Sequence, residues 1–424
     1  MNAIYSIIFM SMTLRLESAL SIGTGERECI VCDEQGNPYI PATSLAGVLR
    51  HAMKAEDGNA LFGHISLERG HSEAAILSKI KIEDAMLDGA WKPVFREGVE
   101  LDDYHTAAGN HKYRVFAVDR GARFHTQMEL EFETREDEER LLPAFLRALS
   151  GLHAGELTMG KKSTRGMGSI RIESCRMKAY RGETLLDSID HTPDREEPVV
   201  LHAPTESDAE KLCYTIRLRN TLCVREYVPL AYRGAGSQEP NCIQMMSGGK
   251  AVIPGTSWAG VFRHGTRAML MKLGISAARS KALCSELFGD AGKNVERIAA
   301  SSVRFADTFF EPNCIRGTRT AIDRCMGGAA RGALYTEDAL VSEKETCAGV
   351  IQIFVRKGRT CTGWGTDMMR LLLRELDEGR LHVGGNGSIG RGLFRVDGLK
   401  EDDRYPELAA LVRCELEQAG EMRG

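Results

Sequence analysis

Two glycine-rich segments place cationic and amide side chains on bare backbone, a combination suited to binding phosphate groups. The first reads MGKKSTRGMGSIRI over residues 159–172, and the second reads VGGNGSIGRGLFRV over residues 383–396. Such loops can turn successive backbone N–H groups toward an anion, although glycines also serve tight turns through their dihedral angles alone. Neither segment has the spacing of a Walker loop, and the second follows a predicted helix, the reverse of a dinucleotide-binding fold. The cationic and amide side chains of these loops are Lys161, Lys162, Arg165, Asn386 and Arg391.

A second repeated feature is a loop that runs into a helix. The stretch IPATSLAGVLRH at residues 40–51 returns as IPGTSWAGVFRH at residues 253–264, with nine of twelve positions identical. In both copies Thr and Ser, residue types that favour N-caps, precede an apolar periodic helix. A helix N-terminus offers free N–H groups to a phosphate, and the glycine in each copy permits close approach of a ligand or another backbone. The polar side chains of these two segments include Ser44, Arg50, Ser257 and Arg263; a capped helix whose glycine serves packing is the alternative.

The repeat extends along both halves of the chain and predicts the fold class. Leu-Phe-Gly follows each shared helix, then come the strand-like segments KIKIEDAM and SSVRFADTF, and later a leucine-rich helix that runs into each glycine loop. This order is βαββαβ, the ferredoxin-like order. We therefore predict an α+β fold with two tandem ferredoxin-like domains and thumb-type insertions. The expected boundaries are a first domain at 1–178, a proline-containing charged linker at 179–210, a second domain at 211–398 and a helical tail at 399–424.

Composition is that of a globular protein with reduced cysteines. The chain has 424 residues, 43% of them hydrophobic and 27% charged, with a net charge of −4 that leaves room for local basic patches. No apolar run is long enough to span a bilayer, and the apolar N-terminus alternates like a strand, so neither a membrane association nor export is expected. The twelve cysteines form no disulfide-like framework, which favours a cytoplasmic location. The one CxxC, Cys29–Cys32, lacks the second pair that a zinc site needs.

These motifs together resemble the RAMP superfamily of CRISPR proteins. The resemblance rests on I-P-x-T-S-x-x-G-V-x-R opening a helix, on L-F-G after it, and on the terminal glycine-rich loop. It is strengthened by TAIDR followed by GGAA, GALY and Glu337, which is similar to the family's thumb hairpin, expected here near residues 314–342. The first half has a shortened echo of this insertion at residues 101–124. More narrowly, the chain resembles the backbone subunits of type III complexes, with two such domains in one chain.

The resemblance implies a guide-RNA-binding subunit of a type III antiviral effector complex. Its partners would be a crRNA guide, a complementary target RNA and other CRISPR effector subunits. Each domain would hold the guide through its helix-start loop and glycine loop, and the thumb would displace a base pair of the guide–target duplex at regular intervals. The predicted RNA contacts in these loops are the residues that match the family: Ser44, Arg50, Lys161, Lys162 and Arg165 in the first half, and Ser257, Arg263, Asn386 and Arg391 in the second. The thumb would be shaped by Thr320, Ile322 and Tyr335 and would contact RNA through Arg319 and Arg324.

The slicing members of the family use an aspartate in the loop before the shared helix, together with a divalent metal. In this sequence Arg27 and Pro240 stand at the expected positions, so Mg²⁺ or another divalent metal is expected only if a neighbouring carboxylate replaces the aspartate. Asp33 fits better as a turn residue. The candidate carboxylates are Glu26, Glu28, Asp33 and Glu239.

Two further readings stay open. His51 and His264 follow the shared arginine, and relatives that process guide precursors use histidine as a general base; a packing role for both is the simpler interpretation. The other reading is a duplicated ferredoxin-like protein with no RNA function.

Overall fold

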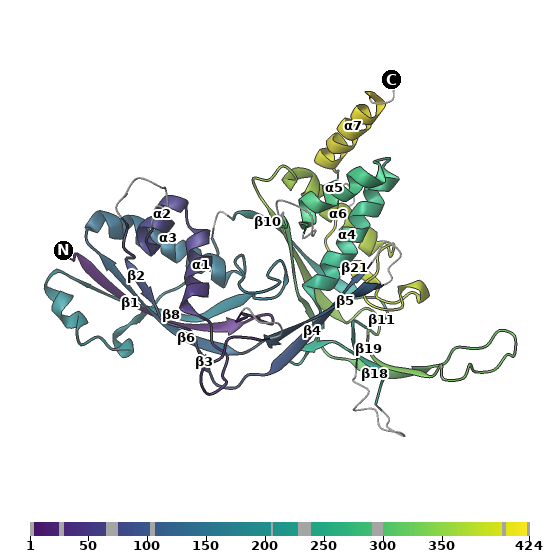
Figure 1. Ribbon diagram of the computed structural model, residues 1–424, viewed down its shortest axis with the longest axis horizontal. Coiled ribbons are helices and arrows are strands. Elements are labelled where there is room, and N and C mark those ends of the chain that lie inside the picture. The colour runs from purple at the N-terminus through teal and green to yellow at the C-terminus, as the bar shows by residue number, and fades with distance from the viewer. Residues whose placement is uncertain are drawn as a thin grey trace. The chain divides into compact units, whose positions relative to one another are not determined.

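The computed structural model describes residues 4–24, 29–64, 75–101, 107–204, 207–227, 239–290, 300–400 and 404–421. By its internal contacts the chain forms two compact units (Figure 1). The first consists of Met1–Arg96, Arg114–Ser163 and Met167–Ser207. The second consists of Glu97–Tyr113, Thr164–Gly166 and Asp208–Gly424, and so includes two short segments from the first half of the sequence. In the described part of the chain, no helix is long and apolar enough to cross a membrane.

The first unit is built around an antiparallel sheet in the order β2-β6-β1-β8-β9. Its central strand, β1, alternates buried and less buried side chains. Ile8, Met10, Met12 and Leu14 face the core with at most 1% exposure. This period of two is what a sheet covered on one face requires. The strands are β1 (Ser6–Leu16), β2 (Ile80–Ile82), β3 (Met86–Asp88, paired with β6), β6 (Arg123–Phe132), β8 (Ile170–Arg181) and β9 (Glu197–Pro198).

Three helices cover one face of this sheet (Figure 1). They are α1 (Ala42–Ala52), α2 (Ala55–Phe62) and α3 (Arg135–His153). The Thr134 side chain caps α3 by accepting a hydrogen bond from the Asp137 N–H. Leu141, Phe145 and Leu149 follow at a spacing of four and are fully buried, so α3 presents one apolar stripe to the sheet. Two 3₁₀ helices, η1 (Gly182–Ser188) and η2 (Pro193–Arg195), precede β9.

An insertion separates β3 from β6 in the first half. It is a two-stranded hairpin of β4 (Pro93–Leu101) and β5 (Ala107–Val118). This hairpin occupies the place in the strand order where the sequence predicts a shortened counterpart of the thumb.

The second unit repeats the same strand order, β21-β10-β20-β16, and adds β7 at the edge. The strands β10, β16, β20 and β21 stand in the positions that β1, β2, β6 and β8 hold in the first unit. The edge strand β7 runs parallel to β16, with Arg165 opposite Phe305 and Gly166 opposite Ala306. The bounds are β7 (Arg165–Gly166), β10 (Ala209–Leu218), β16 (Val303–Ala306), β20 (Ala348–Arg356) and β21 (Phe394–Val396).

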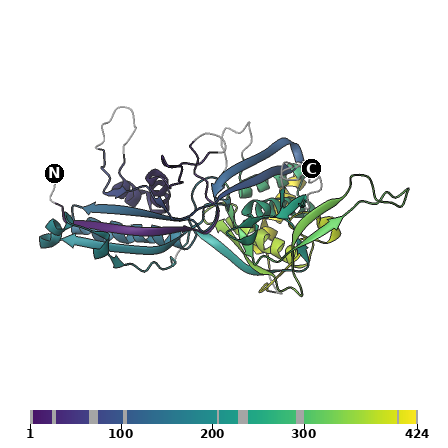
Figure 2. The same cartoon turned by 90° about the horizontal axis from the view of Figure 1, so that it is seen from below.

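A second sheet in this unit forms the root of a projecting hairpin. Its order is β11-β19-β13-β12, with β18 paired to β19. The β18–β19 hairpin extends away from the rest of the unit in two perpendicular views (Figures 1 and 2), and we call residues 314–342 the thumb. The strands are β11 (Thr221–Leu222), β12 (Arg225–Tyr227), β13 (Cys242–Gln244), β18 (Cys314–Arg319) and β19 (Tyr335–Val341).

The remaining elements of the second unit enclose a core of large aromatic side chains. Trp258 and Phe262 on α4 pack beside Phe305 and Phe394 of the main sheet, and all four are fully buried. The elements are α4 (Gly255–Lys272), α5 (Ala277–Phe288), α6 (Thr362–Asp377), η4 (Gly387–Ile389), α7 (Pro406–Glu421) and a small sheet of β14 (Met246–Ser247), β15 (Lys250–Ile253) and β17 (Thr308–Phe310).

The prediction of an α+β fold with two tandem ferredoxin-like domains is confirmed. In both units the first strand lies between the third and the fourth, and the second strand pairs with the third. This is the arrangement that the βαββαβ order produces when each helix crosses the same face of the sheet.

Candidate nucleic-acid interface

The two shared helices start in the same way, but not through the residues that the sequence predicts. Their N-caps are Pro41 and Pro254, with no side-chain cap from the following Thr and Ser. An aspartate from the segment between β2 and β3 replaces that cap: Asp84 Oδ1 accepts from the Ala42 N–H at 2.7 Å. The N-cap prediction is therefore wrong, and a carboxylate of the chain already satisfies one N–H at this helix start.

The second unit repeats this aspartate cap. Asp307 Oδ1 accepts from the Gly255 N–H at 2.8 Å. In addition, a Cβ on Gly255 would lie 2.6 Å from the backbone of Arg165, so β7 lies directly against this helix start. The N-terminus of α4 is thus covered by the chain itself, and only side chains further along the helix can meet a ligand.

The shared arginines connect the two helices of each pair. Arg50 Nη2 donates to Asn59 Oδ1 on α2 at 2.7 Å. Arg263 Nη1 donates to the Gly289 carbonyl after α5 at 3.4 Å. Both side chains are half-buried, as are Ser44 and Ser257 in the first turns. The four predicted contacts therefore stand at equivalent positions of the two helices, and the arginines also have a structural hydrogen bond.

The Leu-Phe-Gly motif has a conformational reason. Gly63 and Gly289 are the C-caps of α2 and α5, with φ/ψ of 80/159° and 77/162°. This region of backbone conformation is essentially restricted to glycine. A Cβ on Gly63 would also lie 2.8 Å from the Ile76 carbonyl oxygen. The motif therefore ends the second helix of each pair and does not itself point to a ligand.

The glycine loops share one backbone scaffold. The Lys161 N–H donates to the Ser21 carbonyl at 2.8 Å, and the Gly385 N–H donates to the Cys223 carbonyl at 2.9 Å. Gly168 and Gly392 each approach a carbonyl so closely that a Cβ would lie 1.8 Å from its oxygen. The outer glycines of each loop are therefore required by packing, and the segment between them is the part that can face a ligand.

A residue-by-residue match of the two glycine loops shows which of their polar side chains are equivalent. Lys162 and Asn386 are equivalent, and both adopt positive φ, at 58° and 65°. Arg391, however, corresponds to Met167, while Arg165 corresponds to Ile389. The two arginines thus occupy different places in loops that share the glycines at 160/384, 166/390 and 168/392. Lys161 is exposed, and Arg165 is half-buried in β7.

Arg391 is not available to a phosphate in this arrangement. It is 8% exposed, and its Nη1 forms an ion pair with Glu337 Oε1 of β19. Arg319 Nη2 lies 3.3 Å from the same oxygen. The pair fastens the glycine loop of the second unit to the root of the thumb, so we leave Arg391 out of the RNA contacts proposed below.

The tip of the thumb combines exposed apolar and cationic side chains. Met326, Leu334 and Ile322 are 84%, 68% and 66% exposed. Arg324 lies between them in the sequence and is also exposed. The tip is closed by Asp323, whose carboxylate accepts from the Cys325 and Met326 N–H groups, and these bonds lower its pKa. The tip is thus a preformed turn that presents apolar groups to solvent.

The four candidate carboxylates do not form a described metal site. Glu26 and Glu28 lie outside the described residues. The Asp33 carboxylate accepts from the Gln35 and Asn37 N–H groups, so this residue holds the turn that the sequence predicts for it. The hydrogen bond with Asp338 raises the pKa of the Arg316 guanidinium, and the charge of Glu239, which is itself exposed, adds to this. Asp33 and Glu239 therefore give no oxygen-ligand set for Mg²⁺.

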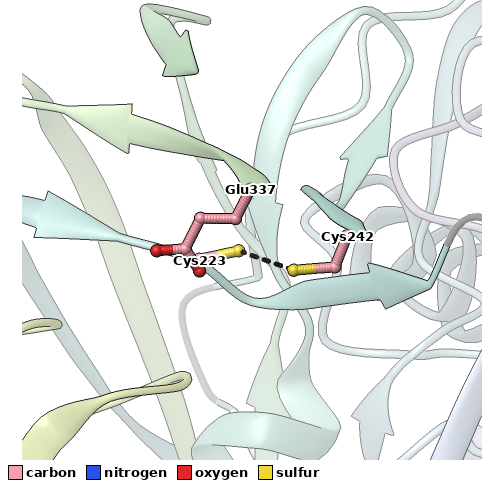
Figure 3. Close-up of side chains that lie close together, drawn as sticks. All are labelled: Cys223, Cys242 and Glu337. Carbon is pink, nitrogen blue, oxygen red and sulfur yellow. Dashed lines mark hydrogen bonds between the residues drawn. The ribbon is translucent and has the colours of Figure 1, made fainter. Parts of the chain in front are cut away.

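A buried cluster that the sequence did not predict lies at the thumb root. Cys223 and Cys242 face each other with their Sγ atoms 4.0 Å apart, beside the Glu337 carboxylate (Figure 3). The Tyr335 hydroxyl lies 2.8 Å from Cys242 Sγ. Hydrogen bonding with Cys223, and then with Tyr335, lowers the pKa of Cys242 to about 7. No spacing rule connects cysteines 19 positions apart, so only the fold brings them together.

The fold and its repeated loops define a duplicated ferredoxin-like protein in which each unit carries the same helix-start and glycine-loop scaffold. A family model for the RAMP superfamily matches residues 13–171 and 247–395, and the chain belongs to this superfamily. Membership supports a CRISPR-associated, RNA-binding role and the corresponding kinds of partner. No curated protein matches the chain.

Proposed function

We propose that this chain is a guide-RNA-binding backbone subunit of a type III CRISPR effector complex. Each unit would hold one segment of the guide, and the thumb would enter the guide–target duplex. Superfamily membership supports RNA binding in general, and the finer role is argued from the surfaces described above.

The observation that carries the proposal is a pair of unexplained helix glycines. Gly47 and Gly260 occupy the same position in α1 and α4, and no described atom lies within 4 Å of a Cβ built on either. Glycine inside a helix costs about 1 kcal/mol relative to alanine. Because packing among the described residues does not require these glycines, a ligand that passes close to the helix surface accounts for both. A sugar-phosphate strand fits this requirement, since it can follow a backbone surface closely.

The cations of the first glycine loop extend the same interpretation. Lys161, Lys162 and Arg165 lie in or next to the first glycine loop, where they would follow phosphates without regard to base identity. In the second unit, Asn386 takes the place of Lys162. Backbone recognition of this kind suits a guide whose sequence varies from one RNA to the next.

The thumb tip supplies the second part of the mechanism. Apolar side chains that are inserted between bases unstack them, as wedge residues of nucleic-acid-bending proteins do. Met326, Leu334 and Ile322 would act as the wedge, and Arg324 would contact the phosphates on either side. Target cleavage with Mg²⁺ is a separate proposal, since it depends on Glu26 and Glu28.

Guide binding can be tested with single-stranded RNAs of unrelated sequence. We expect Lys161→Ala and Arg165→Ala to weaken binding of every RNA, and each lost phosphate contact to reduce the salt slope by about 0.7. Arg135→Ala is the matched control. Arg135 is exposed and paired with Glu139 in the first turns of α3, at the end of the helix opposite to the glycine loop. Loss confined to one RNA sequence, or an equal loss with Arg135→Ala, would contradict backbone recognition.

The glycine argument has its own test. Gly47→Ala should make the chain more stable by up to about 1 kcal/mol, because alanine is the better helix former. The same variant should bind RNA more weakly, because the new methyl group occupies the approach path. Unchanged RNA affinity in a stabilised Gly47→Ala protein would show that no ligand passes there.

The wedge is tested in the assembled effector complex with a fluorescent base analogue in the guide–target duplex. The double change Ile322→Ser and Met326→Ser should reduce the signal from displaced bases. Leu186→Ser is the control, since Leu186 is an equally exposed apolar residue (76%) outside the thumb. Displacement that survives the double change would refute the wedge.

A further inference from the structure

Three potential metal ligands converge at the root of the thumb from three different strands. Cys223 directly follows β11, Cys242 opens β13, and Glu337 lies in β19. Strands β13 and β19 run parallel, with Cys242 opposite Glu337 in the register. The backbone therefore fixes the side chains on one side of the sheet, and their ligand atoms all lie within 4.8 Å of one another. Both cysteines are fully buried, and Glu337 is 1% exposed.

The separation of the two sulfur atoms fits a metal site better than a disulfide. In a tetrahedral site with Zn–S bonds of about 2.3 Å, two sulfur ligands lie about 3.8 Å apart. The observed Sγ–Sγ distance is 4.0 Å. A disulfide would require the two atoms to approach to about 2.05 Å. A bound ion thus needs almost no change in the separation of the sulfur atoms, whereas a covalent bond would need them to come about 2 Å closer.

Glu337 gives an independent sign that a ligand belongs here. Its Oε1 is paired with Arg391 and Arg319, but its Oε2 is buried and has no hydrogen-bond partner. A buried carboxylate oxygen without a partner is costly. Holding one oxygen with cations while the other meets an ion is the usual arrangement of a carboxylate ligand and its supporting groups.

We propose that Cys223, Cys242 and Glu337 bind a thiophilic divalent cation of the zinc class. On binding, the two thiols release their protons to solvent, so two thiolates and one carboxylate face the ion. Thiolates select zinc over Mg²⁺, which separates this site from any slicing chemistry. The fourth position would be taken by water or by the Tyr335 hydroxyl, which lies 2.8 Å from Cys242 Sγ. The ion would clamp β11, β13 and β19 together and fix the thumb's root, whether or not the thumb enters a duplex.

Metal content of the full-length chain, purified with reductant and without chelator, tests this proposal. We expect about one zinc per chain in the wild type. Cys242→Ser should lose it, whereas Cys284→Ser should keep it, because Cys284 is an equally buried cysteine away from the cluster. Circular dichroism of both variants establishes that loss of metal is not loss of fold. Retention of full zinc by Cys242→Ser would overturn the proposal.

A spectroscopic arm does not depend on any variant. Co²⁺ added to the chelator-treated wild type should produce thiolate-to-cobalt absorption, and Zn²⁺ should abolish it. Bound Zn²⁺ should also protect Cys223 and Cys242 from alkylation, as mapped by mass spectrometry. Absence of the cobalt bands, or a Cys223–Cys242 disulfide in the isolated protein, would overturn the proposal.

Discussion

The buried ion pair between Arg391 and Glu337 can be broken by a single substitution, Arg391→Met. Methionine keeps much of the side-chain volume but removes the cation. Glu337 is 1% exposed and would then face only Arg319, whose side chain is 38% exposed and 3.3 Å away. Removing one partner of a buried pair costs about 3–5 kcal/mol, because the other charge stays desolvated. Since Arg319 compensates in part, we expect a loss of about 3 kcal/mol in the free energy of unfolding.

Thermal and urea unfolding, followed by tryptophan fluorescence, measure this loss. Trp258 and Trp364 are buried in the second unit and report on its core. For a unit of this size, about 3 kcal/mol corresponds to a fall in Tm of about 6–12 °C. Lys250→Met is the control, because Lys250 and Glu311 form an exposed pair, with 41% and 80% side-chain exposure, that should contribute under about 1 kcal/mol.

The double variant Arg391→Met/Glu337→Leu separates a broken charge pair from poor packing. With every variant and the wild type compared after chelator treatment, so that Glu337 meets no ion, replacing both charges with apolar groups should restore most of the lost stability, because no buried charge is left unpaired. If Arg391→Met is no more destabilising than Lys250→Met, and the double variant recovers nothing, the guanidinium is not held by Glu337. Arg391 would then return to the set of phosphate contacts.

Three further outcomes are expected from the described contacts. Gly63→Ala should lose about 1–3 kcal/mol in urea unfolding, and more than Gly121→Ala, which has positive φ but open space around it; equal losses would remove the role of the close carbonyl. Burial alone would raise the pKa of Glu138, but hydrogen bonds from Arg181 and Ser6 outweigh burial, so the pKa lies below its ordinary 4.5. The carboxylate therefore stabilises the fold fully above pH 4.5 and ceases to do so as the pH falls through the lowered pKa. The difference in urea midpoint between wild type and Glu138→Gln should therefore narrow as the pH falls below 4.5 and close below the lowered pKa; a constant difference would contradict this. Glu239→Ala should not change the cleavage pattern of complementary RNA incubated with the assembled complex and Mg²⁺, because the charge of Glu239 acts on Arg316. Altered cleavage on a sequencing gel would give Glu239 a catalytic role.

The duplicated α+β architecture could be predicted from the sequence because it depends on local patterns. The alternation in β1, the apolar stripe of α3 and the repeated helix starts are each encoded within a few adjacent residues. The order of these elements leaves few topologies open. The turn at Asp33 was predictable for the same reason, since its carboxylate bonds to N–H groups two and four residues away.

The helix caps show where local reasoning failed. Thr43 and Ser44 are N-cap types, and nothing nearby in the sequence competes with them. The competitor is Asp84, 42 residues further along the chain. The one available signal was that an aspartate stands at the corresponding place in both strand-like segments, KIKIEDAM and SSVRFADTF.

Arg391, Glu337 and the two facing cysteines mark the limit of the sequence. By residue type Arg391 is a phosphate contact, and by spacing Cys223 and Cys242 are unrelated. The packing of the glycine loop onto the thumb root places Arg391 in an ion pair with Glu337. The pairing of β13 with β19 brings Cys242 close to Cys223 and Glu337. The sequence by itself thus determined the elements and their order, because those arise from short-range periodicity and backbone preferences. Which charges are buried, paired or free was decided by tertiary structure, because burial and Coulombic contact depend on distances between residues far apart in the chain.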